Sequence, residues 1–599
     1  MSVTVAGGTR TAPAAGAIAR ANWRPLAITG AYALFALVLT FPIALDLAGA
    51  VADFGDPLVM VWYLAWYAHS IPGNIGGILD PPIFFPHRDV LLFHDHLIAQ
   101  GIAAWPIVRA TGNPVLALNL LVVVSFTLAA LGGNLLTLRF TGSRPAAFLV
   151  GLAVAFSAFR IAHVSHLNLL WLHWLPFVLL VLERFLVRGG IATMLALGLL
   201  VNLLVLSSYN FAPLVAVALA VWIVVRLASE PSLLRRLPSL ALGLGVVAAT
   251  TAAINLPLAL RYLAVSERLG FSRSADEVRA YSASLTDYLV VPPSNGLLGQ
   301  IVAPIRAADW SERALFPGIV VVAFAPVGVW VAIRSHGRPR SIGLALTALA
   351  VVMLILSFGL NPAQLPGLRW YPWLFEHLPG LAGLRAPARA GGVVQIALAL
   401  LAGFGLAKVL RSGDGTVRAA IATGLAGLLF VESVAFPSSY AVPVWLGEGA
   451  VAQPTDTYPA LGRNPASLAP ASTAAVDWLR TAPGSGAIAE IPMLLHTERA
   501  WLESVRMLAG TRHWRPLVNG TSAYRPADLV ELSRRLAAFP TAGTVEQLRA
   551  LGVEYVIVHR GSLSEVERGA LDSALPTSPL TEVARFDNDV VYQIGEPPG

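Results

Sequence analysis

The chain has 599 residues, of which 56% are apolar and 13% are charged. Ordinary globular proteins contain roughly 45–50% apolar and about 25% charged residues. So much apolar surface cannot be hidden in water-soluble cores, which excludes a soluble multidomain protein and predicts an integral membrane protein with many spans. The sequence has no cysteine, which excludes disulfides, thiolate metal sites and cysteine nucleophiles. The net charge of +7 comes mostly from arginines in short loops, and it does not form the patch that a nucleic-acid partner requires.

Residues 1–24 lack a short apolar stretch that ends in a small-residue cleavage site, so we interpret them as a cytoplasmic tail and not as a cleaved signal peptide. About eleven apolar runs of span length follow, which predicts a mainly α polytopic bundle over residues 25–436. The runs cover residues 25–47, 114–137, 145–160, 167–187, 191–208, 211–227, 238–260, 315–333, 341–359, 390–410 and 418–436.

The arginines indicate the orientation of these spans. Basic residues precede the first span and follow every even-numbered one, whereas the short odd-numbered exits are poor in them. The positive-inside rule then predicts a cytoplasmic N-terminus and a C-terminus on the outer side. Large loops at residues 48–113, 261–314 and 360–389 would also lie outside.

The C-terminal part of the chain is more polar and mixed in pattern. Residues 437–470 are rich in Pro, Ala, Gly and Ser and predict a linker, and residues 471–599 predict a small α/β domain outside the membrane. Within this domain the patterns favour strands at 487–492 and 553–560, helices at 526–539 and 544–552, and a hairpin at 584–594.

The first outer loop carries two acids, Asp53 and Asp56, just beyond the first span. An aromatic helix follows in which Trp62, Trp66 and His69 share one face, and we expect it to lie in the membrane interface. A carboxylate at this boundary suits a reaction on a lipid-linked substrate, as a general base or as a ligand of a divalent cation. The alternative for an acid before Pro57 is a helix N-cap.

The same loop contains a second candidate interfacial helix, residues 83–108, with His94, Asp95 and His96. This cluster resembles a metal site in composition. On a helix, however, residues 94 and 96 point apart. We therefore favour hydrogen bonds to the interface or to a substrate over metal ligation.

Arg160, His163 and His166 follow one another at intervals of three residues near the outer ends of the third and fourth spans. Polar side chains at membrane depth are costly, which makes them candidates for a functional site. The guanidinium fork of Arg160 could bind a phosphate. The alternatives are an arginine that extends to the interface and histidines that make interfacial hydrogen bonds.

Arg385 and Arg389 lie on the predicted outer side, where the positive-inside trend does not favour arginine. An anionic ligand such as a lipid phosphate explains them, and pairing with a loop acid such as Glu376 is the alternative.

In the C-terminal domain, a segment with Trp514 and Tyr524 could either grip a carbohydrate or pack the domain onto the membrane. The sequence has no GxxxxGK[ST], GxSxG or HExxH motif, so ATP-driven transport, serine hydrolysis and zincin chemistry lack support.

The odd number of spans, the acid after the first span and the polar outer C-terminal domain together resemble the GT-C glycosyltransferase superfamily. The resemblance is specific to a group of bacterial GT-C-like membrane proteins. It lies in five segments: FGDPLVMVWYLAWYAHSI, FFPHRD, FRIAHVSHLNLLWLHWLP, LRAPARA and HWRPLVNGTSAYRP. A bacterial inner-membrane location follows from this resemblance.

The resemblance implies a polyprenyl-phosphate sugar as donor. It implies that Asp56, or as second choice Asp53, is the catalytic base or a metal ligand. Two residues separate these acids, whereas the superfamily pairs adjacent acids, so both an enzyme without a cofactor and one with Mg²⁺ or Mn²⁺ stay open. The candidates for binding the donor phosphate and the substrate are Arg160, His163, His166, Arg385, Arg389, His94, Asp95 and His96.

We therefore predict a glycosyltransferase that moves a sugar to a glycan, lipid or protein acceptor at the outer face of the bilayer. A single base favours an inverting single displacement. The alternative is a membrane protein without enzymatic activity that binds, transports or scaffolds lipid-linked glycans.

Overall fold

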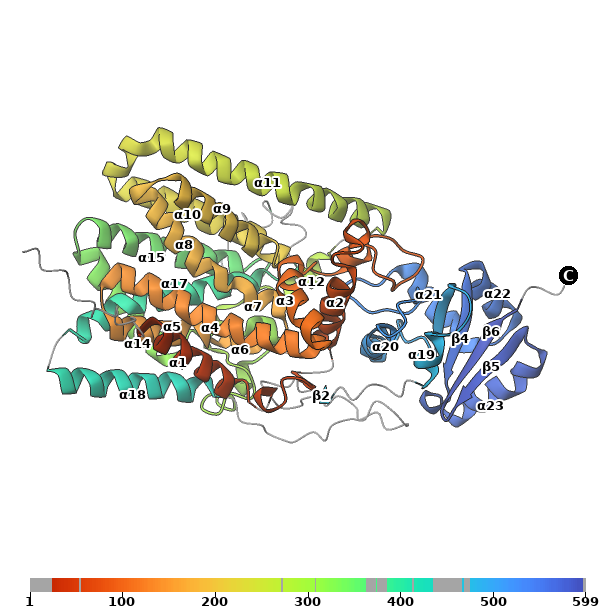
Figure 1. The fold of residues 1–599 in the computed structure, drawn as a ribbon. Helices are drawn as coiled ribbons and strands as arrows, with labels where there is room; N and C mark the ends of the chain where they lie inside the picture. The colour runs from red at the N-terminus through yellow and green to blue at the C-terminus, as the bar shows by residue number, and fades with distance from the viewer. Residues whose placement is uncertain are drawn as a thin grey trace, which may run out of the picture.

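The computed structural model describes residues 24–41, 43–52, 55–270, 273–307, 309–361, 373, 377, 385–411, 414–434, 466–467 and 474–595. A bundle of long helices makes up most of the molecule, and a small domain with a sheet lies at one end of it (Figure 1). The predicted tail 1–24 and the predicted linker 437–470 lie almost wholly outside the described residues, as do Asp53 and most of the predicted loop 360–389.

Apolar helices occupy the positions of all eleven predicted spans. Among the described residues, eight stretches are long and apolar enough to cross a membrane: Pro114–Thr141, Arg144–Ala162, Leu167–Arg188, Tyr209–Ser229, Pro231–Arg268, Arg338–Ser357, Pro387–Val409 and Gly415–Ser433. Three shorter apolar helices, Pro25–Leu39, Ile191–Val205 and Ile319–Arg334, lie at the other three positions. The predicted polytopic helix bundle is thus confirmed.

Helix α17 (Ala390–Val409) is the centre of the bundle, because 94% of its apolar window is buried inside the protein. It packs against α4 (Pro114–Thr141), α5 (Arg144–Ala155), α14 (Ile319–Arg334) and α15 (Arg338–Ser357). The contact with α14 depends on glycine: a Cβ at Gly328 would lie 1.8 Å from the carbonyl oxygen of Leu401. Small residues at this crossing let the two backbones approach closely, as in other membrane helix pairs.

Two helices lie along opposite edges of the bundle, α11 (Leu237–Arg268) and α18 (Gly415–Ser433) (Figure 1). The apolar windows of these spans are only 17% and 6% buried within the protein. Their outer faces therefore expose apolar side chains over a long stretch, which suits contact with lipid. The remaining bundle helices are α1 (Arg24–Leu39), α8 (Trp174–Arg188), α9 (Ile191–Val205) and α10 (Ala212–Ser229).

The first outer loop differs from the prediction in two respects. Helix α2 (Asp56–Ser70) does not lie exposed at an interface, because the side chains from Pro57 to Ala68 are all buried. It packs against α3 (Ile98–Thr111) and α4 on the bundle side and against α20 (Leu502–Gly510) of the C-terminal domain. The predicted second helix is helical only in part, since residues 94–97 connect a 3₁₀ turn (Val90–Phe93) to α3.

The C-terminal domain contains a four-stranded sheet in the order β3-β4-β6-β5. Strands β3 (Ala487–Ile491) and β4 (Val553–His559) are parallel, and β6 (Asp589–Ile594) is antiparallel to both β4 and β5 (Leu580–Phe586). The predicted strands, the hairpin and both predicted helices are confirmed. The helices of this domain are α19 (Ala474–Leu479), α20, α21 (Ala527–Arg535), α22 (Ala542–Ala550) and α23 (Glu565–Ala574).

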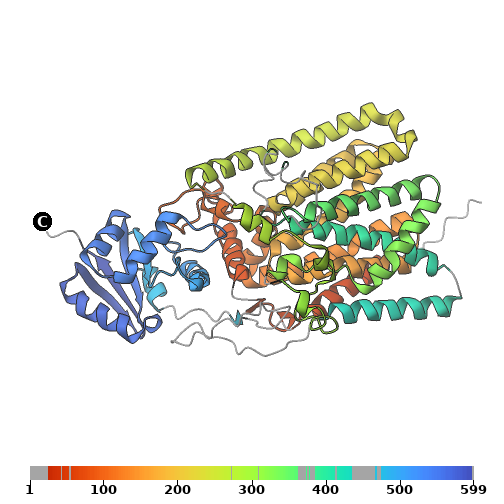
Figure 2. The ribbon, with the colours of Figure 1, turned by 180° about the vertical axis from the view of Figure 1, so that it is seen from behind.

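An aromatic contact joins this domain to α2. The ring of Trp514 stacks on His69 at a centroid distance of 4.2 Å and lies 5.7 Å and 6.2 Å from Trp66 and Trp62. The three α2 residues therefore share a face, as the spacing predicted. The Trp514 segment thus packs the domain onto α2, which differs from the predicted packing onto the membrane. The same segment faces α2 and the first outer loop when the molecule is seen from behind (Figure 2).

A buried polar network spans the sheet of the C-terminal domain. The two ring nitrogens of His559 lie 2.9 Å from Glu490 and 2.8 Å from Asp589. Burial alone would lower the pKa of His559, but the hydrogen bonds to the two carboxylates raise it to about 9. The protonated ring therefore stabilises the folded domain.

This network predicts how the stability of the domain depends on pH. The folded-state pKa of His559 lies above its unfolded value, so its contribution is complete below about pH 6.5 and is lost as the pH rises through about 9. We expect His559→Gln to lower the free energy of unfolding by at most about 3 kcal/mol at pH 6 and by little at pH 10. Denaturant unfolding of the full-length protein in detergent measures this. Arg585→Gln, which breaks an exposed pair on β5, is the matched control. The prediction would be contradicted if the free energy of unfolding changed by the same amount in wild type and in His559→Gln between pH 6 and pH 10.

Candidate active site

Asp56 is the first residue of α2, so it follows the N-cap residue, Gly55, and does not occupy the cap position itself. Instead, Asp56 Oδ2 lies 2.7 Å from Nε2 of His166, in the turn before α7 (Leu167–Leu170). The Asp56 side chain is 48% exposed, so it stays reachable. The capping alternative is therefore not supported for Asp56.

The two groups of this pair hold each other in the charged form. Desolvation would raise the pKa of Asp56, but the hydrogen bond and charge of His166, with the charges of His94 and Arg385, lower it below its ordinary value. For His166, desolvation would lower the pKa, and Asp56 raises it. Asp56 is thus an ionised carboxylate at neutral pH, oriented by a single histidine.

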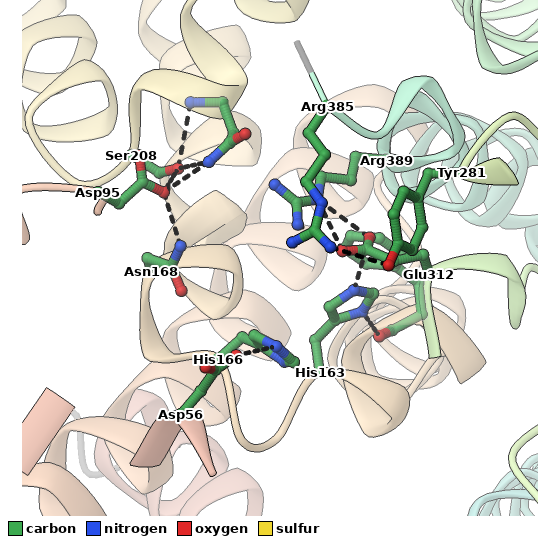
Figure 3. A network of polar contacts seen from close by, with 12 residues as sticks. Asp56, Asp95, His163, His166, Asn168, Ser208, Tyr281, Glu312, Arg385 and Arg389 are labelled. Carbon is green, nitrogen blue, oxygen red and sulfur yellow. Dashed lines mark hydrogen bonds and ion pairs between the residues drawn. The ribbon is translucent and has the colours of Figure 1, made fainter. Parts of the chain in front are cut away.

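A second acid, Glu312, binds two further predicted residues. Its carboxylate accepts hydrogen bonds from Nε and Nη2 of Arg389, with Nε 3.0 Å from Oε2, and lies 3.2 Å from Nε2 of His163. His163 Nδ1 is 2.7 Å from the carbonyl oxygen of Phe159. Burial would raise the pKa of Glu312, but Arg389 and His163 hold it well below its usual range. This network joins three segments of the chain (Figure 3).

Arg385 lies four residues before Arg389 and is less buried. Its Nη2 donates a 2.8 Å hydrogen bond to the Tyr281 hydroxyl, its guanidinium lies 4.5 Å from the centroid of the Tyr281 ring, and its Nε is 2.9 Å from Glu277. These contacts fix a cation that is still 36% exposed. The predicted alternative partner, Glu376, lies outside the described residues.

Asp95 is held by three donors. Its Oδ2 accepts hydrogen bonds from Nδ2 of Asn168 (2.6 Å), from the Ser208 hydroxyl (2.5 Å) and from Nδ2 of Asn210 (2.6 Å). Burial would raise the pKa of Asp95, but the charge of His94 and the hydrogen bonds from Ser208 and Asn168 lower it.

The two neighbouring histidines do not share a site with each other. His94 packs edge-on against Tyr63 at a centroid distance of 5.8 Å, whereas His96 is buried against Tyr209 at 4.6 Å. Residues 94–97 are not helical, so the helical argument against a metal at this cluster does not apply. The separate environments of the two rings still disfavour a shared metal. Burial lowers the pKa of His96, which favours the neutral ring.

Arg160 is placed differently from the prediction. Its Nε, Nη1 and Nη2 donate to the carbonyl oxygens of Ala155 and Leu170 and to the hydroxyl of Ser125, at 2.7–3.0 Å. The residue is only 3% exposed. Because all three nitrogens are already bound within the bundle, the structure supports Arg160 as a packing residue of the short helix α6 (Ala158–Ala162) and not as a phosphate ligand.

The predicted residues that do come together surround one region at the end of the bundle that faces the C-terminal domain. In Figure 3, Asp56 with His166, Asp95 with Asn168, and the two arginines lie on three sides of a common space. The charges of Asp56 and Asp95 both act on Arg389, and that of Arg385 acts on Asp56. In this region the half-exposed carboxylate of Asp56 can accept a proton. The neighbouring arginines can bind an anion.

The arrangement of these residues does not suit a divalent cation. Within the described part of the chain, no group of three or more His, Asp or Glu side chains is arranged to hold a metal. Asp53, the second predicted acid, lies outside that part.

Several residues of the site were not predicted from the sequence. Glu312, Tyr281, Asn168, Ser208 and Asn210 bind the predicted residues in the structure. One signal was available: Ser207, Ser208 and Asn210 form a short polar run between two apolar spans. Glu312 gave no such signal, because an acid in a polar loop is ordinary.

Comparison with solved structures identifies the class of this fold. The mycobacterial arabinofuranosyltransferase AftD matches with a TM-score of 0.52 and 13% identity over 96% of this chain and 42% of its own. ArnT from Cupriavidus metallidurans, in a structure bound to undecaprenyl phosphate, matches at 0.48 and 14% over 96% and 99% of the two chains. The oligosaccharyltransferase of Archaeoglobus fulgidus matches at 0.47 and 14% over 90% and 70%.

The match to AftD, with a TM-score above 0.5, confirms the predicted GT-C fold. At such low identity the likeness is one of fold. The sequence matches no protein-family model and no curated protein.

The Glu312–Arg389 pair gives a test of the architecture. Arg389→Gln leaves a buried carboxylate without its cation, which typically costs about 3–5 kcal/mol. We expect a clearly lower thermal midpoint for the protein in detergent. The double variant Arg389→Gln, Glu312→Gln should recover most of that loss, because no buried charge is left unpaired. Arg418→Gln, at an exposed position of α18, is the control. A double variant less stable than the single one would contradict this account.

Proposed function

We propose that the protein is a membrane glycosyltransferase that moves a sugar from a polyprenyl-phosphate donor to an acceptor hydroxyl on a glycan, lipid or protein. The observation that carries the proposal is the half-exposed carboxylate of Asp56, held by His166 near Arg385 and Arg389. The fold shared with an arabinofuranosyltransferase supports the same class of reaction.

The chemistry follows from the positions of these charges. Asp56 accepts the proton of the acceptor hydroxyl as the acceptor oxygen forms a bond to the anomeric carbon of the sugar. The bond between that carbon and the phosphate oxygen breaks, and the electron pair leaves with the phosphate. Arg385, whose side chain is 36% exposed, stabilises the negative charge that develops on this leaving group. Arg389 is paired with Glu312 and lies behind it. A single displacement of this kind inverts the anomeric centre.

Asp56→Asn tests the base. The variant keeps the shape of the side chain but cannot accept the proton, so we expect sugar release to fall by about 10²–10⁴-fold in a protein that still unfolds in a cooperative thermal transition. The assay uses protein in vesicles with a panel of radiolabelled polyprenyl-phosphate sugars. Asp46→Asn, an exposed acid of the same outer region, should keep wild-type activity.

Full activity in Asp56→Asn would remove Asp56 from the chemistry. Binding of a donor by wild type without turnover of any donor in the panel would instead favour a protein that binds, transports or scaffolds lipid-linked glycans.

We further propose that the protein lies in the bacterial inner membrane with its N-terminus in the cytoplasm and its C-terminal domain outside. The absence of native cysteine allows single-cysteine labelling without further engineering. Ser573 on α23 and Ser239 near the start of α11 are both exposed. In right-side-out vesicles, we expect a membrane-impermeant maleimide to label Ser573→Cys at once and Ser239→Cys only after permeabilisation. The reverse pattern would overturn the orientation.

A further inference from the structure

The two carboxylate oxygens of Asp95 differ in their hydrogen bonds. Its Oδ2 is saturated by three donors that come from three positions of the chain, Asn168, Ser208 and Asn210. Among the described residues, Oδ1 has no hydrogen-bond partner, and it is not enclosed as a buried unpaired atom. The side chain is therefore fixed in orientation with one free acceptor oxygen.

Asn168 offers a second free acceptor close by. Its Nδ2 must face Asp95, because a carboxylate needs donors, and this fixes the direction of the amide. Its Oδ1 then points away from Asp95 and is buried without a partner among the described residues, in a side chain that is only 5% exposed. Figure 3 shows this oxygen turned toward the space between Asp95 and the Asp56–His166 pair. A buried acceptor left unpaired is costly, which points to a ligand that donates hydrogen bonds.

A sugar ring presents such donors, because its neighbouring hydroxyl groups are spaced to reach two acceptors at once. A carboxylate oxygen makes a charge-assisted hydrogen bond with a hydroxyl, which is stronger than a neutral one. Asp95 is already stabilised by three donors, so it is better suited to accept hydrogen bonds than to remove a proton. In Figure 3, Asp95 and Asn168 face Arg385 and Arg389 across the same space, so the acceptor pair and the proposed phosphate site border one region.

We propose that Asp95 and Asn168 form a subsite that binds hydroxyl groups on the sugar of the lipid-linked donor. This inference rests on the proposed function and adds a residue pair that selects the sugar. Asp95 and Asp56 then have separate tasks: Asp95 recognises the sugar ring and Asp56 acts on the acceptor hydroxyl.

The test compares two kinds of lipid probe on the full-length protein in nanodiscs, without any acceptor. One probe is undecaprenyl phosphate, and the other is a panel of undecaprenyl-phosphate pentoses and hexoses. We expect wild type to bind at least one sugar-bearing lipid about 10- to 100-fold more tightly than undecaprenyl phosphate. Asp95→Asn and Asn168→Ala should lose most of this difference while binding undecaprenyl phosphate as wild type does. Arg385→Gln is the matched control and should weaken both kinds of probe alike.

Two results would overturn the inference. One is a wild-type protein that binds no sugar-bearing lipid more tightly than undecaprenyl phosphate. The other is an Asp95→Asn variant that either keeps the difference or weakens both probes equally, as a merely structural residue would. Sugar release is measured separately. Sugar-dependent binding without sugar release would contradict the proposed enzymatic activity but not the proposed subsite.

Discussion

The ion pair between Glu312 and Arg389 is buried at the end of the helix bundle that faces the C-terminal domain, and neither charge could be buried there alone. The pair fixes the outer loop 261–314 against the start of α17. Its third member, His163, lies in the turn that also carries His166, the partner of Asp56. Segments far apart in the sequence are thus brought to one place because a buried carboxylate must be neutralised.

Two acids of the first outer loop, Asp56 and Asp95, show how different surroundings give similar side chains different properties. Among the described residues, His166 is the side chain that binds Asp56, which keeps almost half of its own side chain exposed. Asp95 is held by three neutral donors on one oxygen. A lightly held, accessible carboxylate suits proton transfer, and a firmly held one suits recognition. The difference arises from the polar run at 207–210 and from Asn168, which belong to spans and turns outside the loop itself.

Hydropathy predicted the positions of the helices well, because a bilayer demands apolar runs of a set length. It also singled out polar residues at the outer ends of spans, and Asp56, His163, His166 and Arg389 do lie together. Hydropathy could not predict the direction in which a side chain points. Arg160 was therefore expected in the site, although its guanidinium is bound inside the bundle from the short helix α6. Periodicity likewise could not show that residues 94–97 break the predicted helix, or that α2 is covered by protein and not by lipid headgroups.

The stacking of Trp514 on α2 has a consequence for any attempt to divide the molecule. An excised C-terminal domain would expose Trp514 together with the backbone of Gly520, which lies against the Phe84 ring. The remaining bundle would expose Trp62 and Trp66 at its end. Each fragment would expose an apolar aromatic surface and would tend to self-associate. The two parts therefore form one unit for expression, and an insertion or fusion is better tolerated at the far end of the sheet, on β5 and α23.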